Sequence, residues 1–258
     1  MDGEASNGRR LPPWLASVAG VVGLLVVWQV LGATLFARSG SVPTPTAIIS
    51  QVNNDGLHFY WRNAVTTVSA AGKGWMYGNA LAIALALLVL VVPWAERPVL
   101  QLGITSYCLP VVAIGPIFAI VFGGETPKVV LAGMSVFFTT LIGALVGLRS
   151  ADPASLDMVH AYGGGSVAKL MKVRLRACLP SLFAGLRIAS PAAILGAIIG
   201  EYLGAERGLG VAMINSEQSL EVSRTWAIAL VATLIAGLAY GVTALVGLLL
   251  TPWARRAV

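Results

Sequence analysis

The amino-acid sequence predicts an all-α, polytopic membrane protein with six transmembrane helices, and three observations lead to this fold class. Hydrophobic residues make up 57% of the 258 positions and charged residues only 11%, whereas a soluble domain carries roughly a quarter charged residues. Uncharged apolar runs recur at about the 20 residues needed to cross a hydrocarbon core. Polar segments that contain glycine or proline separate these runs. We therefore expect one helical domain that lies mostly in lipid.

The N-terminal part of the chain supplies a tail, one span and an outer loop. Residues 1–13 are polar, and we expect them to form a cytoplasmic tail. Residues 14–36 carry no charge and form the first predicted transmembrane helix. This run is too long for a signal peptide and lacks a cleavage site, so we expect it to be retained. Residues 37–62 form an outer loop and then an interfacial segment with adjacent aromatic rings. We expect the loop, Arg38–Gly56, to be extended rather than helical because it contains Pro43 and Pro45.

Residues 63–252 form the predicted core domain, and residues 253–258 form a second cytoplasmic tail. The other five predicted spans are Trp75–Val92, with a start as early as Asn63, Val99–Phe122, Pro127–Leu148, Ile188–Leu203 and Thr225–Leu250. Pro110 and Pro116 lie inside the third span of the chain and must bend it. Six spans place both ends of the chain on the same side of the membrane.

The distribution of basic residues predicts which side that is. We assign eleven of the 17 Lys and Arg residues to the side of the two tails and six to the other side. The six are Arg38, Arg62, Lys73, Lys128, Arg207 and Arg224. Because cytoplasmic segments are enriched in Lys and Arg, we expect both tails in the cytoplasm, and the net charge of +6 requires no nucleic acid partner.

The most distinctive segment is the long basic connection of residues 149–187, between the fourth and fifth spans. The triplet Gly163–Gly165 breaks one helical pattern and Pro180 marks the edge of the next. This pattern predicts a short helix, a turn, and a second basic helix that returns to the bilayer. Long ordered connections are usually functional. On the pattern alone, a docking surface and a re-entry loop with a solvated basic face are equally supported.

The sequence offers no site for a cofactor. The glycine triplet is not followed by Lys-Ser or Lys-Thr and no strand precedes it, so it is not a phosphate-binding loop. Cys108 and Cys178 lie at different predicted depths, so we expect no disulfide, and their spacing suits no metal. We expect no catalytic residue, metal or cofactor in this chain, and any ATP must be bound by a partner.

Motifs along most of the chain match one family of transporters. Within the connection, Asp157 stands six residues before Gly163, and Leu179-Pro180 is followed by Ala184-Gly185-Leu186-Arg187. Further matches are Val42-Pro43-Thr44-Pro45, Leu109-Pro110, and Glu201 followed by Gly208-Leu209-Gly210. With these residues the sequence resembles the permease subunit of a type I ABC importer, and more narrowly the nitrate/taurine/aliphatic-sulfonate branch. Met158 and Val159 depart from the two alanines of the family motif, and Arg176 stands where the branch often has an earlier proline.

The resemblance implies the type I importer permease fold and a coupling helix that ends near Gly163 and docks on a separate ATPase subunit. The residues that it assigns to this coupling are Asp157, Met158, His160, Ala161, Tyr162, Gly163, Gly164, Gly165 and Pro180. Met158 and Tyr162 would supply apolar contacts, and Asp157 a polar anchor. The implied partners are a second permease copy, two ATPase subunits that bind ATP and magnesium, and an extracytoplasmic binding protein.

Four residues are candidates for the pathway or its gate. Pro110 and Pro116 free backbone carbonyls in the third span, and broken membrane helices normally line buried or wet cavities. Tyr107 lies close by. Glu201 lies at the outer end of the fifth span, where a gating or structural role is favoured over contact with the solute. The alternative for the third span is a kinked packing helix whose hydroxyl groups bond to their own turn.

Rival functions are a stand-alone secondary transporter and a membrane subunit without a transport role. A secondary transporter should carry ion-coupling carboxylates inside its spans, and the first four spans have none. The motifs of an intramembrane enzyme are missing from the sequence. Within the branch, sulfonates, nitrate, taurine and vitamin precursors such as pyrimidines or riboflavin are all open as solutes.

Overall fold

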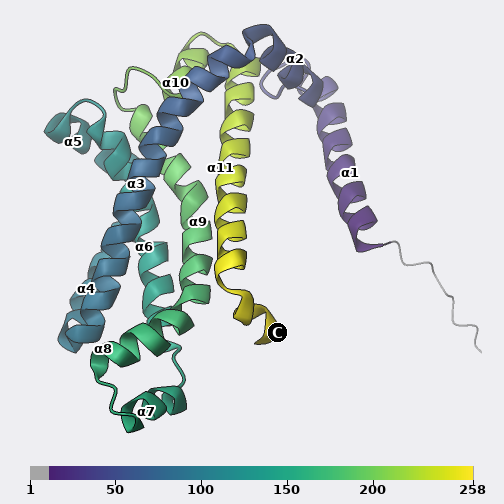
Figure 1. Cartoon of the computed structure of the whole chain (residues 1–258). Helices are drawn as coiled ribbons and strands as arrows, with labels where there is room; N and C mark the ends of the chain where they lie inside the picture. Colours follow the sequence, from purple (N-terminus) through teal and green to yellow (C-terminus); the bar gives the residue numbers. More distant parts are fainter. Residues whose placement is uncertain (1–11, 258) are drawn as a thin grey trace, which may run out of the picture.

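The computed structural model describes residues 12–257, and all regular structure in that range is helical. The α-helices are α1 Pro13–Ala33, α2 Pro45–Asp55, α3 Leu57–Val91, α4 Glu96–Cys108, α5 Val111–Phe122, α6 Thr126–Arg149, α7 Pro153–Ala161, α8 Ser166–Lys169, α9 Leu175–Glu201, α10 Leu209–Gln218 and α11 Val222–Leu250. A π-helical turn, Leu170–Arg174, joins α8 to α9, and short 3₁₀ segments cover Pro93–Ala95 and Pro252–Ala257. Figure 1 shows the arrangement.

Five segments of the described chain are long and apolar enough to cross a membrane: α1, α3, α6, Ser166–Glu201 and α11. The third predicted span, Val99–Phe122, is broken into α4 and α5, which meet at an angle of 97°. The break lies at Leu109–Pro110, where proline excludes a continuing helix. Pro116, which was also expected to bend the span, lies inside α5.

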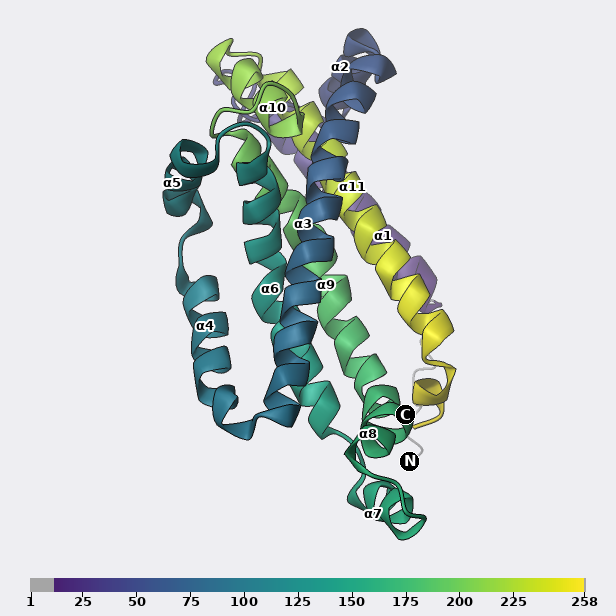
Figure 2. The same cartoon turned by 60° about the vertical axis from the view of Figure 1, so that its left-hand side comes forward.

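The spans alternate in direction between two ends of the molecule. The α2 and α10 helices lie at one end, called here the outer end, and α7 and α8 lie at the other, the inner end (Figures 1 and 2). The α1 helix runs toward the outer end and α11 runs back toward the inner end. The described chain therefore begins and ends on the side of the long connection, whereas most of the predicted tail, residues 1–11, lies outside the described residues.

Helices α3, α6 and α9 form the core because small residues let their backbones approach closely. Ala71, Ala132, Ala189 and Ala197 are buried where the three helices meet. A Cβ atom at Gly147 of α6 would lie 2.7 Å from the carbonyl oxygen of Cys178 in α9. Helices α6 and α9 consequently pack as one closely fitted pair.

The outer loop is not extended throughout, as the sequence predicted, because residues 45–55 form the helix α2. Pro45 occupies the first helical position, where proline is favoured, and the Thr44 side chain caps the helix.

Two helices extend beyond the spans that the sequence predicted. The α3 helix has 35 residues and starts at Leu57, because the aromatic segment expected at the interface is helical and continuous with the second span. Lys73, which the sequence assigned to the outer side, therefore lies in the middle of α3. The α9 helix likewise begins at Leu175 and runs through Pro180, which does not mark a helix edge. Membrane helices tolerate such prolines because neighbouring groups satisfy the freed carbonyls.

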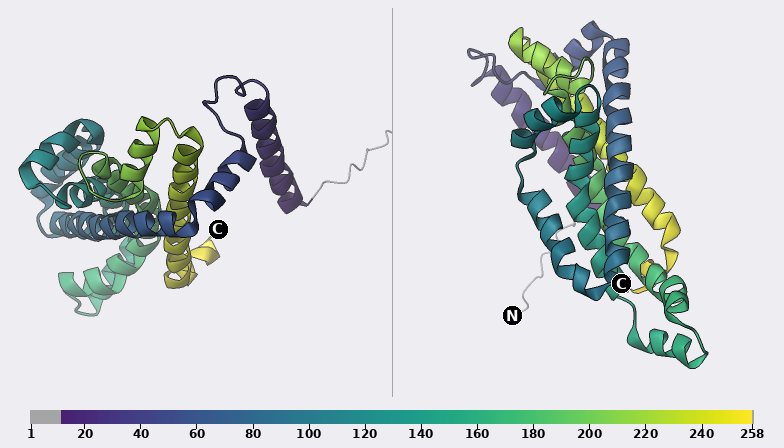
Figure 3. Two further views of the ribbon diagram at one scale, coloured as in Figure 1. Left: turned by 90° about the horizontal axis from the view of Figure 1, so that it is seen from above. Right: turned by 90° about the vertical axis from the view of Figure 1, so that its left-hand side faces the viewer.

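The α1 helix stands apart from the bundle (Figure 3, left). It is joined to the rest through α2 and through a ring contact between Trp28 and Trp226 of α11, whose centroids are 5.7 Å apart. Most of its apolar side chains are exposed. Another surface, either lipid or protein, must cover them in the membrane.

Candidate functional site

The short helix α7 is built from local interactions and is not held by burial in a core. Asp152 caps its start, because its carboxylate accepts hydrogen bonds from the backbone nitrogens of Ser155 at 3.1 Å and Ala154 at 3.4 Å. The Ser155 hydroxyl donates a further bond at 2.9 Å. These bonds, with that of the Ser155 side chain foremost, lower the pKa of Asp152. Pro153 fits the first helical position, where no N–H donor is needed.

At two of the three positions after α7 the structure requires glycine. Gly163 has φ +77°, a left-handed conformation, and its N–H donates to the His160 carbonyl at 2.9 Å. A Cβ atom at Gly164 would lie 2.5 Å from a methyl carbon of Val159. Gly165 has an ordinary φ of −78° and nothing within 4 Å of its Cβ position. Gly163 thus allows the turn in the backbone, and Gly164 leaves room for the Val159 side chain.

The surface of α7 is open over its whole length. No residue of the helix is buried. The Met158 side chain is 64% exposed and that of Tyr162 86% exposed, while Asp157, His160 and Ala161 are exposed beside them. The helix projects beyond the inner ends of the spans (Figure 2). Large apolar side chains displayed on a projecting polar loop are typical of a protein-docking surface.

The exposed helix α7 is attached to the most closely packed helix pair among the described residues. Residues 150–152 join α7 to the end of α6, and the Ser150 hydroxyl donates to the carbonyls of Gly147 at 2.8 Å and Ala177 at 3.2 Å. Arg149 forms an ion pair with Glu96 at the start of α4. The end of α6 next to α7 is thus hydrogen-bonded to α9. Pro180 lies farther along α9, away from α7, and is half-buried against α11.

The four pathway candidates do not form one site. Tyr107 is 68% exposed, and its ring lies 4.8 Å from that of Phe138. Pro110 and Pro116 are also exposed. Glu201, in contrast, is 1% exposed and points into the protein.

Glu201 joins three helices at the outer end. The Thr67 hydroxyl of α3 lies 2.8 and 3.0 Å from the two carboxylate oxygens, and the Gly210 N–H of α10 donates to Oε2 at 2.8 Å. Thr67 also accepts the Leu209 N–H at 2.9 Å. Gly208 has φ +143° and lies directly against the carboxylate. This arrangement gives Glu201 a structural role, and we call Thr67, Glu201 and Gly208–Gly210 the outer clasp.

Thr67 was not among the predicted site residues, although the sequence around it contains a signal. Asn63 and Thr67 are one turn apart on α3, among apolar residues, and both are buried. Buried polar side chains in a membrane helix require a partner. The partner of Thr67 is 134 positions away in the sequence, and local periodicity cannot reveal it.

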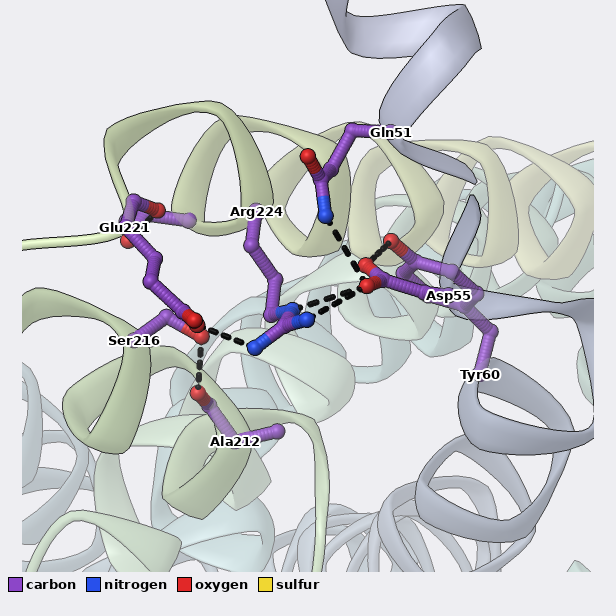
Figure 4. A network of polar contacts seen from close by, with 8 residues as sticks. Gln51, Asp55, Tyr60, Ala212, Ser216, Glu221 and Arg224 are labelled. Atoms are coloured by element: carbon purple, nitrogen blue, oxygen red, sulfur yellow. Dashed lines mark hydrogen bonds and ion pairs between the residues drawn. The ribbon is translucent and has the colours of Figure 1, made fainter. Parts of the chain in front are cut away.

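A second polar network holds the outer end together (Figure 4). Asp55, at the end of α2, accepts bonds from the Arg224 Nε and Nη2 atoms at 2.9 and 2.7 Å and from the Tyr60 hydroxyl at 2.7 Å. Gln51 donates at 2.9 Å, and Glu221 forms an ion pair with Arg224. Burial raises the pKa of Asp55, but the bonds from Arg224, Tyr60 and Gln51 outweigh it, so the pKa is lowered overall.

A polar cleft of about 340 Å³ opens beside this network at the outer end. Its charged lining residues are Arg62, Glu206, Arg207, Glu221 and Arg224. The sequence placed Arg62, Arg207 and Arg224 on the outer side without indicating that they share one cleft.

Comparisons with known proteins agree with this architecture. A family model described as "Binding-protein-dependent transport system inner membrane component" matches residues 78–258. The chain is 31% identical over 225 residues to a "Probable ABC transporter permease protein" of Haemophilus influenzae, covering 86% of this chain and 89% of that protein. It is 29% identical to the "Formylaminopyrimidine transport permease protein ThiX" of Halalkalibacterium halodurans, covering 72% and 75% of the two chains. It is 24% identical to the "Putative aliphatic sulfonates transport permease protein SsuC" of Bacillus subtilis, covering 85% and 80%.

The fold has a counterpart among solved structures. A chain from the inward-facing MetNI methionine ABC transporter matches with a TM-score of 0.59 and 14% sequence identity. The match covers 76% of this chain and 95% of the MetNI chain.

Proposed function

Because the chain belongs to the family of binding-protein-dependent transport system inner membrane components, and is a permease subunit of an ABC importer, we propose that α7 is the helix through which a separate ATPase drives it. The chain is a multi-pass membrane protein with the type I importer permease fold, and it is not itself an enzyme. Family membership leaves the stand-alone secondary transporter and the non-transport subunit without support.

One observation carries the coupling proposal. The helix α7 has no buried residue, and it is attached to the closely packed pair of α6 and α9. Met158 and Tyr162 would enter a groove of the ATPase, with Asp157, His160 and Ala161 around them. Gly163 and Gly164 set the direction in which the backbone leaves α7. Closure of the ATPase around ATP would then move α6 and α9 together, and the outer clasp would pass that movement to α3 and α10. Gly165 and Pro180, which the resemblance also assigned to coupling, have no contact that supports such a role.

The transport cycle needs an external energy source. To shift an inward-open to outward-open ratio from 1:99 to 99:1 requires about 5.5 kcal/mol of differential binding. We assign that energy to ATP and magnesium bound by the ATPase partner. We also propose cytoplasmic tails, since the inner end carries the basic connection, and a homodimer of permeases with one ATPase for each copy.

The outer end would receive the solute from the binding protein. The cleft beside Arg224 mixes acidic and basic side chains, which suits a transient protein contact. The Asp55–Arg224 network holds α2 against α11 and would keep that contact surface in one shape. The solute proposed here is a small organic molecule, in keeping with the names of the relatives.

Co-purification tests the coupling proposal. The double variant Met158→Glu, Tyr162→Ala should lower the amount of ATPase that co-purifies with the permease by about tenfold or more, because central apolar anchors dominate such interfaces. Trp94→Ala is the matched control, since Trp94 is 80% exposed in the connection between α3 and α4 but lies outside α7. Retention of the ATPase by the double variant would refute a docking role for α7.

A further inference from the structure

Arg187 is a charged residue deep in a membrane span, and its side chain is exposed on the surface of the chain. It is the one charged residue between Cys178 and Gly200. At 1.5 Å per residue, it lies about 13 Å along α9 from Cys178 and about 18 Å from Ile199. Charged residues at such depth normally face the interior of a helix bundle or a water-filled cavity.

The guanidinium group of Arg187 is held in place without a counter-charge. It lies over the Tyr240 ring of α11, 6.0 Å from the ring centroid, which is a cation–π arrangement. Among the described residues, no carboxylate lies within ion-pair distance of it, and Glu201 is engaged in the outer clasp. Its five N–H donors are therefore available for a ligand.

A pocket of about 180 Å³ opens at this side chain, between α9 and α11. Its walls are mostly apolar or hydroxyl-bearing, and include Phe183, Ala184, Thr243 and Gly247. The Thr243 hydroxyl already donates to the Ala239 carbonyl at 2.9 Å and lies 2.7 Å from that of Ser190. The strongest unused donor in the pocket is thus the guanidinium itself.

We propose that Arg187 is a solute-contacting residue of the translocation pathway, and that the solute carries an oxyanion group, either sulfonate or carboxylate. The planar guanidinium fork matches such groups with two parallel hydrogen bonds. This inference rests on the proposed transport function and names the chemical class of the solute. Lys73 adds a second exposed cation at the middle of α3, and no exposed carboxylate lies within the described spans to repel an anion.

A lipid phosphate is the competing occupant, and the depth of Arg187 disfavours it. Phosphate groups lie at the membrane surface, whereas Arg187 is nine residues from the polar inner end of the apolar stretch. An arginine side chain is shorter than the resulting distance of about 13 Å. Arg176, three turns nearer the inner end and also exposed, is better placed for lipid phosphate.

Charge-selective labelling of a cysteine in the pocket tests the proposal. The full-length chain, in membrane vesicles with its ATPase, carries Cys108→Ser and Cys178→Ala to remove its own thiols and Ala184→Cys to place one in the pocket. Two methanethiosulfonate reagents are compared, one with a sulfonatoethyl group and one with a trimethylammonioethyl group. The ratio of the anionic to the cationic labelling rate should fall by about tenfold with Arg187→Gln and be largely kept with Arg187→Lys. Excess ethanesulfonate should slow anionic labelling, and excess choline should not.

Arg176→Gln is the matched control. It removes a positive charge from the same helix about 16 Å away, beyond the screening length of about 8 Å at physiological salt, so the ratio should stay unchanged. Failure of both reagents to label the cysteine would mean that the pocket faces lipid, and an unchanged ratio with Arg187→Gln would mean that Arg187 does not select anions. Either result overturns the inference while leaving ATPase co-purification through Met158 and Tyr162 as a separate test of the transport function.

Discussion

Gly208 lies so close to Glu201 that a Cβ atom at position 208 would overlap the carboxylate. The glycine also has φ +143°, which side-chain-bearing residues rarely adopt. The two residues lie seven positions apart, at the end of α9 and just before α10. Their contact closes the outer clasp, and it explains why a carboxylate and a glycine-rich turn occur together in this sequence.

Gly208→Ala should therefore destabilise the protein by about 3 kcal/mol or more, because backbone strain and steric overlap act together. Thermal unfolding of the detergent-solubilised protein measures the loss. Gly204→Ala is the control: Gly204 has φ +118° but nothing within 4 Å of its Cβ position, so only strain remains. Equal losses in the two variants would show that the contact with Glu201 contributes nothing.

Thr67→Val should destabilise the clasp by about 1–3 kcal/mol while keeping the shape of the side chain. The change leaves the Leu209 N–H without its acceptor and leaves one oxygen of Glu201 without its donor. Thr66→Val is the matched control, because among the described residues the Thr66 hydroxyl bonds only to the Arg62 carbonyl in its own helix. We expect the free energy of unfolding of the control to lie within about 0.5 kcal/mol of that of the unchanged protein. Thermal unfolding of both variants measures the difference.

Asp55 predicts how the stability of the outer end depends on pH. Its pKa is lower in the folded protein than in the unfolded chain, so the folded state favours the carboxylate form. The stabilisation is fully present above the unfolded pKa of about 3.9. It is lost as the pH falls through the lower folded pKa.

Asp55→Asn should accordingly destabilise the protein most near neutral pH, by about 1–3 kcal/mol. The difference in melting temperature between this variant and the unchanged protein should shrink as the pH drops below about 4. Melting curves recorded across this range measure the difference. A gap that stays constant with pH would mean that the Asp55–Arg224 pair does not provide the stabilisation.

Gly163→Val should uncouple ATP hydrolysis from solute uptake while the spans stay folded. A β-branched residue is strained at φ +77°, so the turn after α7 would adopt another conformation and α7 would point in another direction. Uptake into vesicles and ATP hydrolysis are measured in the same preparation. Gly165→Ala, at φ −78° with open space around its Cβ position, should behave like the unchanged protein. Normal uptake by the Gly163 variant would argue against the coupling role.

The parts of the structure that could be predicted are those encoded by neighbouring residues. The glycine triplet predicted a short helix followed by a turn, and both are present. The helix start at Asp152-Pro153 is also encoded by neighbouring residues, although it was not predicted. Apolar run length identified the spans. Pro110 predicted a bend in the third span. The bend angle of 97° depends on how α5 packs against α6 and α9, and no local sequence pattern contains that information.

The parts that could not be predicted depend on long-range pairing. Lys73 and the aromatic residues after Leu57 interrupt the hydropathy of α3 without interrupting its helix, since other helices cover its small residues. Glu201 was recognised as structurally important, but its burial depends on Thr67 and Gly210 from other elements. Arg187 was predicted to be the last residue of the cytoplasmic connection, but it lies inside α9, well within a span. Its exposure is a property of the packed helices, which a local pattern does not contain.

The α9 helix has 27 residues and runs from the inner end of the molecule to the outer end. At 1.5 Å per residue it is about 40 Å long, so a tilt of about 5° at its inner end would carry the opposite end sideways by about 3.5 Å. Angular changes too small to disturb side-chain packing locally can thus become displacements comparable to the width of a small solute. Geometry of this kind lets a modest rearrangement on one membrane face determine access on the other.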